Sequence, residues 1–316
     1  MYMVVNTMLS ALGALINVFM LILALIKFPT NMRLCSVIIT IKSCSDIMIC
    51  VLNYFVMQRI VTDGDHIFLI STGSCTHLGP TACYSGFMFL TCFIEFNLIW
   101  IGCSYWFRYY TLHCHDPKAR TIRLIAFCQI VVLFFLVTGW ISFFNPKTST
   151  FPAKLLSMEP SDMVILGGPL VYNSTLTVFA VLLISVCLVL ILFFWIRDVL
   201  INFQAATSEV ENMNMLLVKV YKIQVILSMF TLLGIAIFFL QFTKTIEHHY
   251  LIYTIPLLFM ISPILSPFSY LLFLPNLQNY FNTERLEFEE PEFHERRRSS
   301  RYQSVTFMTS STTLVP

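Results

Sequence analysis

Charged residues are scarce in this chain of 316 residues: they make up 11% of it, whereas hydrophobic residues make up 57%. Lys and Arg number 19 and Asp and Glu number 17, so the net charge of +2 provides no basic field for nucleic acid. A water-soluble fold of this composition would have too few polar side chains to cover its surface. The scarcity of charge therefore excludes a soluble domain and a nucleic-acid-binding protein, and it indicates a lipid bilayer as the partner.

Catalytic motifs are absent as well. The sequence contains no Ser-x-x-Lys, His-Glu-x-x-His or Gly-x-Ser-x-Gly pattern, and its intramembrane acids do not form an obvious protease pair. We therefore expect no enzyme activity, and no cofactor or metal ion.

Long apolar stretches are present instead. A bilayer-spanning helix needs about 20 apolar residues, and five stretches without any charged residue reach that length. Two further stretches, 36–57 and 83–105, carry only Lys42, Asp46 and Glu95 as charged residues. The pattern predicts an all-α membrane protein with a seven-helix bundle over residues 1–275 and a largely disordered cytoplasmic tail over 276–316. The predicted helices are 3–26, 36–57, 83–106, 124–144, 167–196, 221–243 and 250–274.

Basic residues gather in every second connection between these helices. Connections 1, 3 and 5 hold nine Lys and Arg residues, whereas connections 2, 4 and 6 hold four. Because cations are retained on the cytoplasmic side, this imbalance predicts an outer N-terminus and a cytoplasmic C-terminus. The nine are Lys27, Arg33, Arg108, Lys118, Arg120, Arg123, Arg197, Lys219 and Lys222, and the four are Arg59, Lys147, Lys154 and Lys244.

Glu95 is a lone acid near the middle of the third helix. Ionisable residues inside a membrane are costly and usually face the bundle interior. Two readings stay open: Glu95 contacts a ligand or ion, or it accepts a structural hydrogen bond from a neighbouring helix.

The second connection predicts two local features. Only Cys75 and Cys83 of the ten cysteines fall on the predicted outer side, so our hypothesis is a disulfide between these two. The turn signal Asp63-Gly64 lies between two short β-prone runs, which favours a small hairpin over the bundle mouth. A sequon at Asn173, near the outer end of the fifth helix, is a glycosylation candidate.

The third helix ends in Phe107-Arg108-Tyr109-Tyr110, which places a permanent cation at the inner mouth of the bundle. An interfacial Arg beside a Tyr belt and a signalling residue are both compatible with this spacing. Together with Asn53-Tyr54-Phe55-Val56-Met57-Gln58-Arg59-Ile60 and the stretch from Gly73-Ser74-Cys75 through Gly79-Pro80 to Cys83, it resembles the nematode serpentine chemoreceptors of class delta.

This resemblance implies a G-protein-coupled receptor for small-molecule chemical cues. The expected partners are a volatile or water-soluble ligand and a heterotrimeric G protein, and the expected location is the plasma membrane, on cilia of chemosensory neurons. The alternatives are an odorant-gated seven-span channel of opposite topology and a small-solute transporter, although no internal repeat suggests the latter.

Some positions also resemble those of rhodopsin-like receptors. Arg108 resembles the Arg of the Asp-Arg-Tyr motif, but Phe107 replaces the acid. Ser266-Pro267-Phe268-Ser269-Tyr270 resembles the Asn-Pro-x-x-Tyr turn of helix 7. Asn17 and Asp46 resemble a buried Asn and Asp, so we expect a polar network that includes Asn17, Asp46, Ser266 and Tyr270. The alternative for Asp46 is an ion pair with Lys42, one turn away.

The cytoplasmic face has candidate contact residues for a signalling partner. The fifth connection is compatible with extensions of helices 5 and 6. In the tail, Ser299 and Ser300 follow an Arg cluster, so they are phosphorylation candidates for recruiting a desensitising, arrestin-like protein. A merely solubilising tail is the alternative. The candidate G-protein contacts are Arg108, Tyr109, Arg120, Arg123, Lys219 and Lys222.

Overall fold

In our computed structural model, the described residues form seven long helices, one short helix and one small sheet. The structure describes residues 2–26, 33–63, 66–113, 119–142, 163–167, 169–203, 211–246 and 250–271. Residues Met1–Ser269 form one compact unit and Tyr270–Pro316 a second. The fold below is that of the first unit; Ser299 and Ser300 lie outside the described residues.

Seven of the described helices are long and apolar enough to cross a membrane, as the hydropathy pattern predicted. The third extends seven residues beyond its predicted end, and the fifth and sixth extend into the connection between them. The helices are α1 (Tyr2–Ile26), α2 (Arg33–Val56), α3 (Pro80–His113), α4 (Ala119–Ser142), α6 (Pro169–Phe203), α7 (Glu211–Phe242) and α8 (Leu251–Leu271).

α1 shows how such a helix distributes its side chains. Its apolar residues, such as Leu15 and Phe19, are largely exposed, at 71% and 52%. Small and polar residues, together with Met20, recur at spacings of four and three along the opposite face and are buried. Small residues let helix backbones approach closely in a bilayer, so this face packs against α2 and α8. The buried residues are Asn6, Ser10, Gly13, Asn17, Met20 and Ala24.

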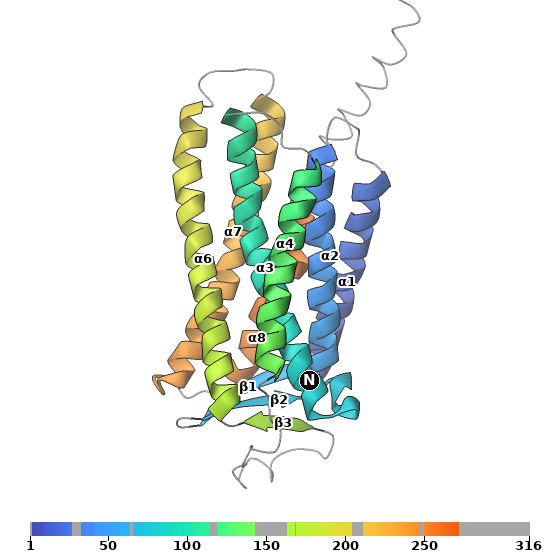
Figure 1. The fold of residues 1–316 in the computed structure, drawn as a ribbon, viewed down its shortest axis with the longest axis vertical. Coiled ribbons are helices and arrows are strands. Elements are labelled where there is room, and N and C mark those ends of the chain that lie inside the picture. Colours follow the sequence, from blue (N-terminus) through green and yellow to red (C-terminus); the bar gives the residue numbers. More distant parts are fainter. Residues whose placement is uncertain are drawn as a thin grey trace, which may run out of the picture. The chain divides into compact units, whose positions relative to one another are not determined.

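The hairpin predicted in the second connection is present. β1 (Gln58–Asp63) pairs antiparallel with β2 (His66–Ser71). A short helix, η2 (Ser74–Leu78), follows and leads into α3. The sheet lies at one end of the helices (Figure 1), as a cover for the bundle mouth requires.

A third strand was not predicted. β3 (Val164–Gly167) pairs antiparallel with β2, which gives the order β1-β2-β3. The start of the fifth helix was predicted at residue 167, but α6 begins at Pro169. Glycine at 167 and 168 and proline at 169 disfavour an earlier helix start, since proline is favoured at the first helical position. The hydrophobic stretch thus divides into a strand and a helix.

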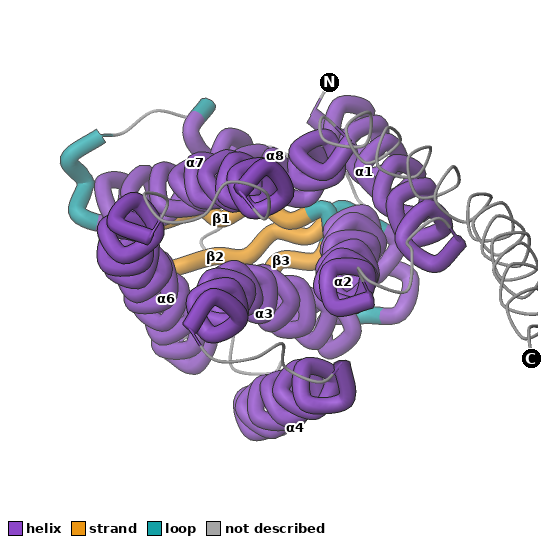
Figure 2. The backbone as a smooth tube through the Cα atoms, turned by 90° about the horizontal axis from the view of Figure 1, so that it is seen from above, coloured by secondary structure: helices purple, strands orange, loops and turns teal. Residues whose placement is uncertain are grey.

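Viewed along the helix axes, the strands pass across the ring of α2, α3, α6, α7 and α8 (Figure 2). α4 stands outside this ring, beside α3 (Figure 2). The main hydrophobic cluster joins residues of the sheet to residues of α2, α3, α6, α7 and α8. The sheet is therefore part of the packed interior and not a separate surface feature.

Candidate functional site

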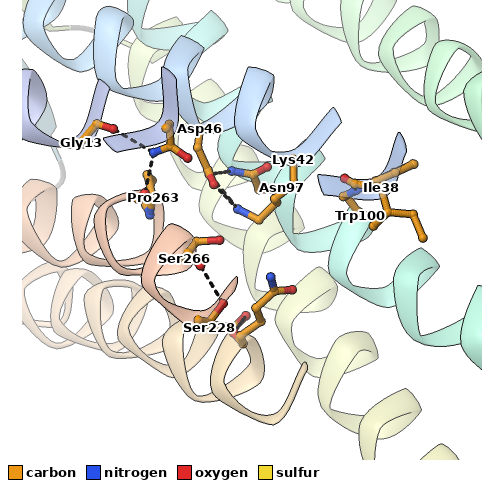
Figure 3. A network of polar contacts seen from close by, with 12 residues as sticks. Gly13, Ile38, Lys42, Asp46, Asn97, Trp100, Ser228, Pro263 and Ser266 are labelled. Carbon is orange, nitrogen blue, oxygen red and sulfur yellow. Dashed lines mark hydrogen bonds and ion pairs between the residues drawn. The ribbon is translucent and has the colours of Figure 1, made fainter. Parts of the chain in front are cut away.

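An ion pair lies inside the bundle between α2 and α3. Lys42 Nζ donates to both carboxylate oxygens of Asp46, each at 2.7 Å. Asn97 Nδ2 of α3 donates to Asp46 Oδ1 at 2.5 Å (Figure 3). Lys42 and Asp46 are each only 1% exposed. Asp46 therefore has Lys42 as its partner one turn away, as the alternative prediction had it. Its second partner, Asn97 from another helix, was not predicted from the sequence.

Asn17 does not serve as the partner of Asp46, contrary to the expected network. Its Nδ2 donates to the carbonyl oxygens of Gly13 and Pro263, each at 2.9 Å. Pro267 has no N–H, so the Pro263 carbonyl four residues earlier lacks its helical donor. Asn17 supplies that donor from α1, and this contact joins α1 to the proline-containing part of α8.

Ser266 comes close to the expected arrangement. Its hydroxyl is buried beside the Asp46 side chain. Ser266 is thus a neighbour of the carboxylate, and its hydroxyl has no hydrogen-bond partner within the described residues. Tyr270 lies in the last turn of α8, at the start of the second compact unit, and its part in a network stays a prediction.

Glu95 is buried in α3, at 5% exposure. Ser185 Oγ of α6 donates to its Oε1, so a structural hydrogen bond to a neighbouring helix is present. Its Oε2 has no hydrogen-bond partner within the described residues. The other interpretation, a contact between Oε2 and a ligand, stays a prediction.

The covered end of the bundle is tied together by a disulfide and by an Arg between two Tyr rings. Cys75 of η2 and Cys83 of α3 are bonded, with Cα atoms 5.0 Å apart. Arg59 Cζ lies 5.8 Å from the Tyr2 ring centre and 5.4 Å from that of Tyr253, which is cation–π geometry. From the sequence, Arg59 could be identified only as a cation of the second connection. The two Tyr rings belong to α1 and α8, which are far from Arg59 along the chain.

Asn173 lies in the first turns of α6. The Thr175 side chain of its sequon is fully buried, at 0% exposure. Its glycosylation stays a prediction.

The opposite end of the bundle brings together the backbones of the predicted G-protein contacts. Arg108 and Tyr109 lie in the last turns of α3, and Lys219 lies in α7. Arg120 and Arg123 in the first turns of α4 are exposed, as is Lys222 in α7. Phe107, where an acid would be in the Asp-Arg-Tyr motif, is buried, and its ring packs edge-on against Trp100 at 6.2 Å.

The amino-acid sequence of this chain is similar to those of known proteins. Residues 2–281 match the family described as Serpentine type 7TM GPCR chemoreceptor Srd. Serpentine receptor class delta-26 of Caenorhabditis elegans is 44% identical over 283 residues, which cover 88% of this chain and 89% of the relative. Class delta-30 of the same species is 42% identical over 282 residues, which cover 88% of this chain and 87% of the relative.

This match confirms the resemblance drawn from the stretch between Asn53 and Tyr110. It concerns a family of receptors and not of enzymes. Its length includes all seven spans, so the chain is a multi-pass membrane protein. The chain belongs to the Srd family of serpentine, seven-transmembrane chemoreceptors of the GPCR type.

Proposed function

We propose that this receptor binds a small-molecule chemical cue near its sheet-covered end and signals from the opposite end to a heterotrimeric G protein. The observation that carries the proposal is the division of the bundle into two unlike ends. One end has the sheet and the disulfide, and the other has the exposed cations Arg120, Arg123 and Lys222. We place the receptor in the plasma membrane of chemosensory cells, on their cilia.

Signalling requires a ligand that binds one arrangement of the helices more tightly than another. The contacts around Asp46 and Asn17 join α2 to α3 and α1 to α8. In this proposal a shift of α8 changes the neighbourhood of Ser266 and Asp46 and thereby reaches α3. Glu95, whose Oε2 has no partner among the described residues, is a candidate contact for a polar group of the ligand.

The extended ends of α6 and α7 are the proposed docking surface for the G protein. α6 continues to Phe203, and α7 begins at Glu211. The Arg and Lys residues at this end of the bundle would then complement acidic groups of the partner. After activation, phosphorylated Ser299 and Ser300 are proposed to recruit an arrestin-like protein.

The proposed orientation predicts which terminus is accessible on intact cells. An epitope tag fused before Met1 should be stained without permeabilisation, and a tag after Pro316 only after permeabilisation, because cation-rich ends are retained in the cytosol. Each tagged chain is its own control before and after detergent. Surface staining of the Pro316 tag on intact cells would contradict the proposal and favour the odorant-gated channel of opposite topology.

Charge reversal at the proposed docking surface should impair coupling. The double substitution Lys219→Glu and Lys222→Glu should raise the half-maximal agonist concentration roughly 5-fold, since each rim charge contributes up to about 1 kcal/mol. The measurement is a calcium or cAMP response to an agonist found by screening volatile and water-soluble compounds. The control is Lys244→Glu, which changes an exposed cation two residues beyond the sheet-covered end of α7. Equal responses of all three receptors would count against the surface.

A further inference from the structure

The two faces of the sheet differ in what they contact. Buried residues Ile60, Leu69 and Leu166, one from each strand, belong to the main hydrophobic cluster of the bundle. Ile60 pairs with Leu69, and Leu69 pairs with Leu166, so all three point to the same side. We call this side the inner face. Alternation along the strands adds Gln58 and Ser71 to it, because these are two residues away from Ile60 and Leu69.

The side chains of Gln58 and Ser71 are polar, and they make no hydrogen bond to the described residues. They face each other across β1 and β2 in the pairing register, and directly opposed side chains have Cβ atoms about 5 Å apart. Gln58 is 4% exposed and Ser71 0%. Both amide atoms of Gln58 and the hydroxyl of Ser71 have no hydrogen-bond partner within the part of the chain that the structure describes.

Two more buried polar atoms without a partner in the described ranges lie toward the same end of the bundle. They are the Thr175 hydroxyl of α6 and the Gln241 carbonyl oxygen Oε1 of α7. Thr175 is four residues before Phe179, and Gln241 is three residues after Phe238, so each shares a helix face with an aromatic ring. The rings of Phe179 and Phe238 are stacked, with centroids 3.9 Å apart.

A third ring completes an aromatic cluster on the bundle side of the sheet. Phe259 of α8 lies 6.0 Å from Phe179, centroid to centroid. All three rings are buried in the hydrophobic cluster that also includes Ile60 and Leu69. The inner face of the sheet and this aromatic cluster therefore belong to one continuous apolar interior, and the unpartnered polar atoms lie toward its sheet end.

The absence of charged side chains on the inner face indicates what kind of ligand it can bind. The three strands contribute no charged residue to the inner face, since its residues in β1 and β2 are Gln58, Ile60, Thr62, Ile67, Leu69 and Ser71. Arg59 projects to the other face by the same alternation, where it stacks with Tyr2 and Tyr253. A charged ligand group would thus be buried without a counter-ion on this face, which is costly.

We propose that Gln58 and Ser71 bind the neutral head group of an apolar ligand, a hydroxyl or a carboxamide, while its hydrocarbon part packs toward Phe179, Phe238 and Phe259. An amide and a hydroxyl each donate and accept, so together they fit a head group that does both. This inference rests on the proposed function and adds to it the ligand class and the contact residues.

The test uses the full-length receptor in lipid nanodiscs, with thermal unfolding measured against increasing probe concentration. The probes are n-octanol, octanamide, heptyl methyl ether and n-octylamine. The alcohol and the amide should raise the Tm more than the ether, which cannot donate a hydrogen bond. Gln58→Met and Ser71→Ala should each raise the Kd for n-octanol about 5-fold, since each removes a hydrogen bond.

The same variants should unfold at a higher temperature than the wild type when no probe is present. Removing an unpartnered buried polar group removes its desolvation cost, so we expect a rise in Tm of roughly 2 to 4 °C. A variant that is more stable and yet binds more weakly cannot be explained by misfolding. Gln129→Met and Ser142→Ala in α4, where Gln129 donates to the Phe96 carbonyl and Ser142 is exposed, are the matched controls and should bind n-octanol as the wild type does.

Three outcomes would overturn the proposal: no stabilisation by n-octanol or octanamide, equal stabilisation by the ether, or wild-type affinity in both variants. Preferential binding of n-octylamine would also overturn it, because that result assigns the head-group contact to the acid Glu95. No G protein takes part in the assay. Probe binding by a receptor that gives no cellular response would therefore contradict the proposed coupling alone.

Discussion

Replacing Lys42 by Met should destabilise the receptor by about 3 to 5 kcal/mol, which is the cost of leaving a buried charge without its counter-ion. Lys42 Nζ contacts both oxygens of Asp46 at 2.7 Å, and neither residue is more than 1% exposed. After the substitution the carboxylate keeps the Asn97 amide as a partner but no cation. Thermal unfolding of the purified receptor and its abundance at the cell surface both measure the loss.

A second substitution should restore most of that stability. In Lys42→Met with Asp46→Leu, no charge remains, and buried ion pairs replaced by apolar residues are often no less stable. Asn97 loses its acceptor, which costs about 1 kcal/mol. Lys222→Met, at an exposed position, is the control for loss of a Lys alone. The explanation is refuted if the double variant unfolds at the same temperature as the single one.

Replacing Gly73 by Ala should cost about 3 kcal/mol, at the upper end of the usual range for overpacking. Gly73 N donates to the Val56 carbonyl at 3.1 Å, where the chain leaving β2 crosses the end of α2. An added Cβ would lie 2.2 Å from the backbone oxygen of Phe55. A backbone atom cannot rotate away as a side chain can, so the end of α2 or the chain before η2 must move.

Alanine substitutions at two other glycines are controls for the loss of stability expected at Gly73. A Cβ at Gly139 in α4 meets no atom within 4 Å, so Gly139→Ala should be neutral or slightly stabilising in a helix. Gly79 also has open space but a φ of +97°, so Gly79→Ala should cost only the backbone strain, of order 1 to 3 kcal/mol. Unfolding temperatures that do not fall in the order Gly139→Ala, Gly79→Ala, Gly73→Ala would show that the crossing is not tightly packed.

Hydropathy predicted the seven helices because every span must satisfy its own backbone hydrogen bonds in lipid. The ion pair of Lys42 with Asp46 was predictable as an alternative, since i and i+4 share a helix face. Asn97 was not, because the rotation of α3 against α2 depends on packing that an almost wholly apolar helix does not reveal. Likewise, Pro267 leaves the Pro263 carbonyl without a helical donor, but nothing near Asn17 in the sequence indicates that its amide supplies the missing hydrogen bond.

The sheet, too, was predictable from the sequence only in part. The hairpin of β1 and β2 was predictable from a local turn signal and two short β-prone runs. β3 comes from a connection about a hundred residues later, and its four residues carry too little pattern to mark them as a strand. Gln58 and Ser71 gained their importance only when the pairing register placed them opposite each other on the inner face.

The order of the strands has a consequence for biosynthesis. β2 lies between β1 and β3, so one of its edges gains a partner only when the ribosome has passed Gly167. By then the helices α1 to α4 have been made. A nascent chain that stalls before that point would carry a hairpin with an open edge, and unpaired strand edges invite aggregation. Chaperone retention of this receptor should accordingly last until translation has passed Gly167, about halfway along the chain.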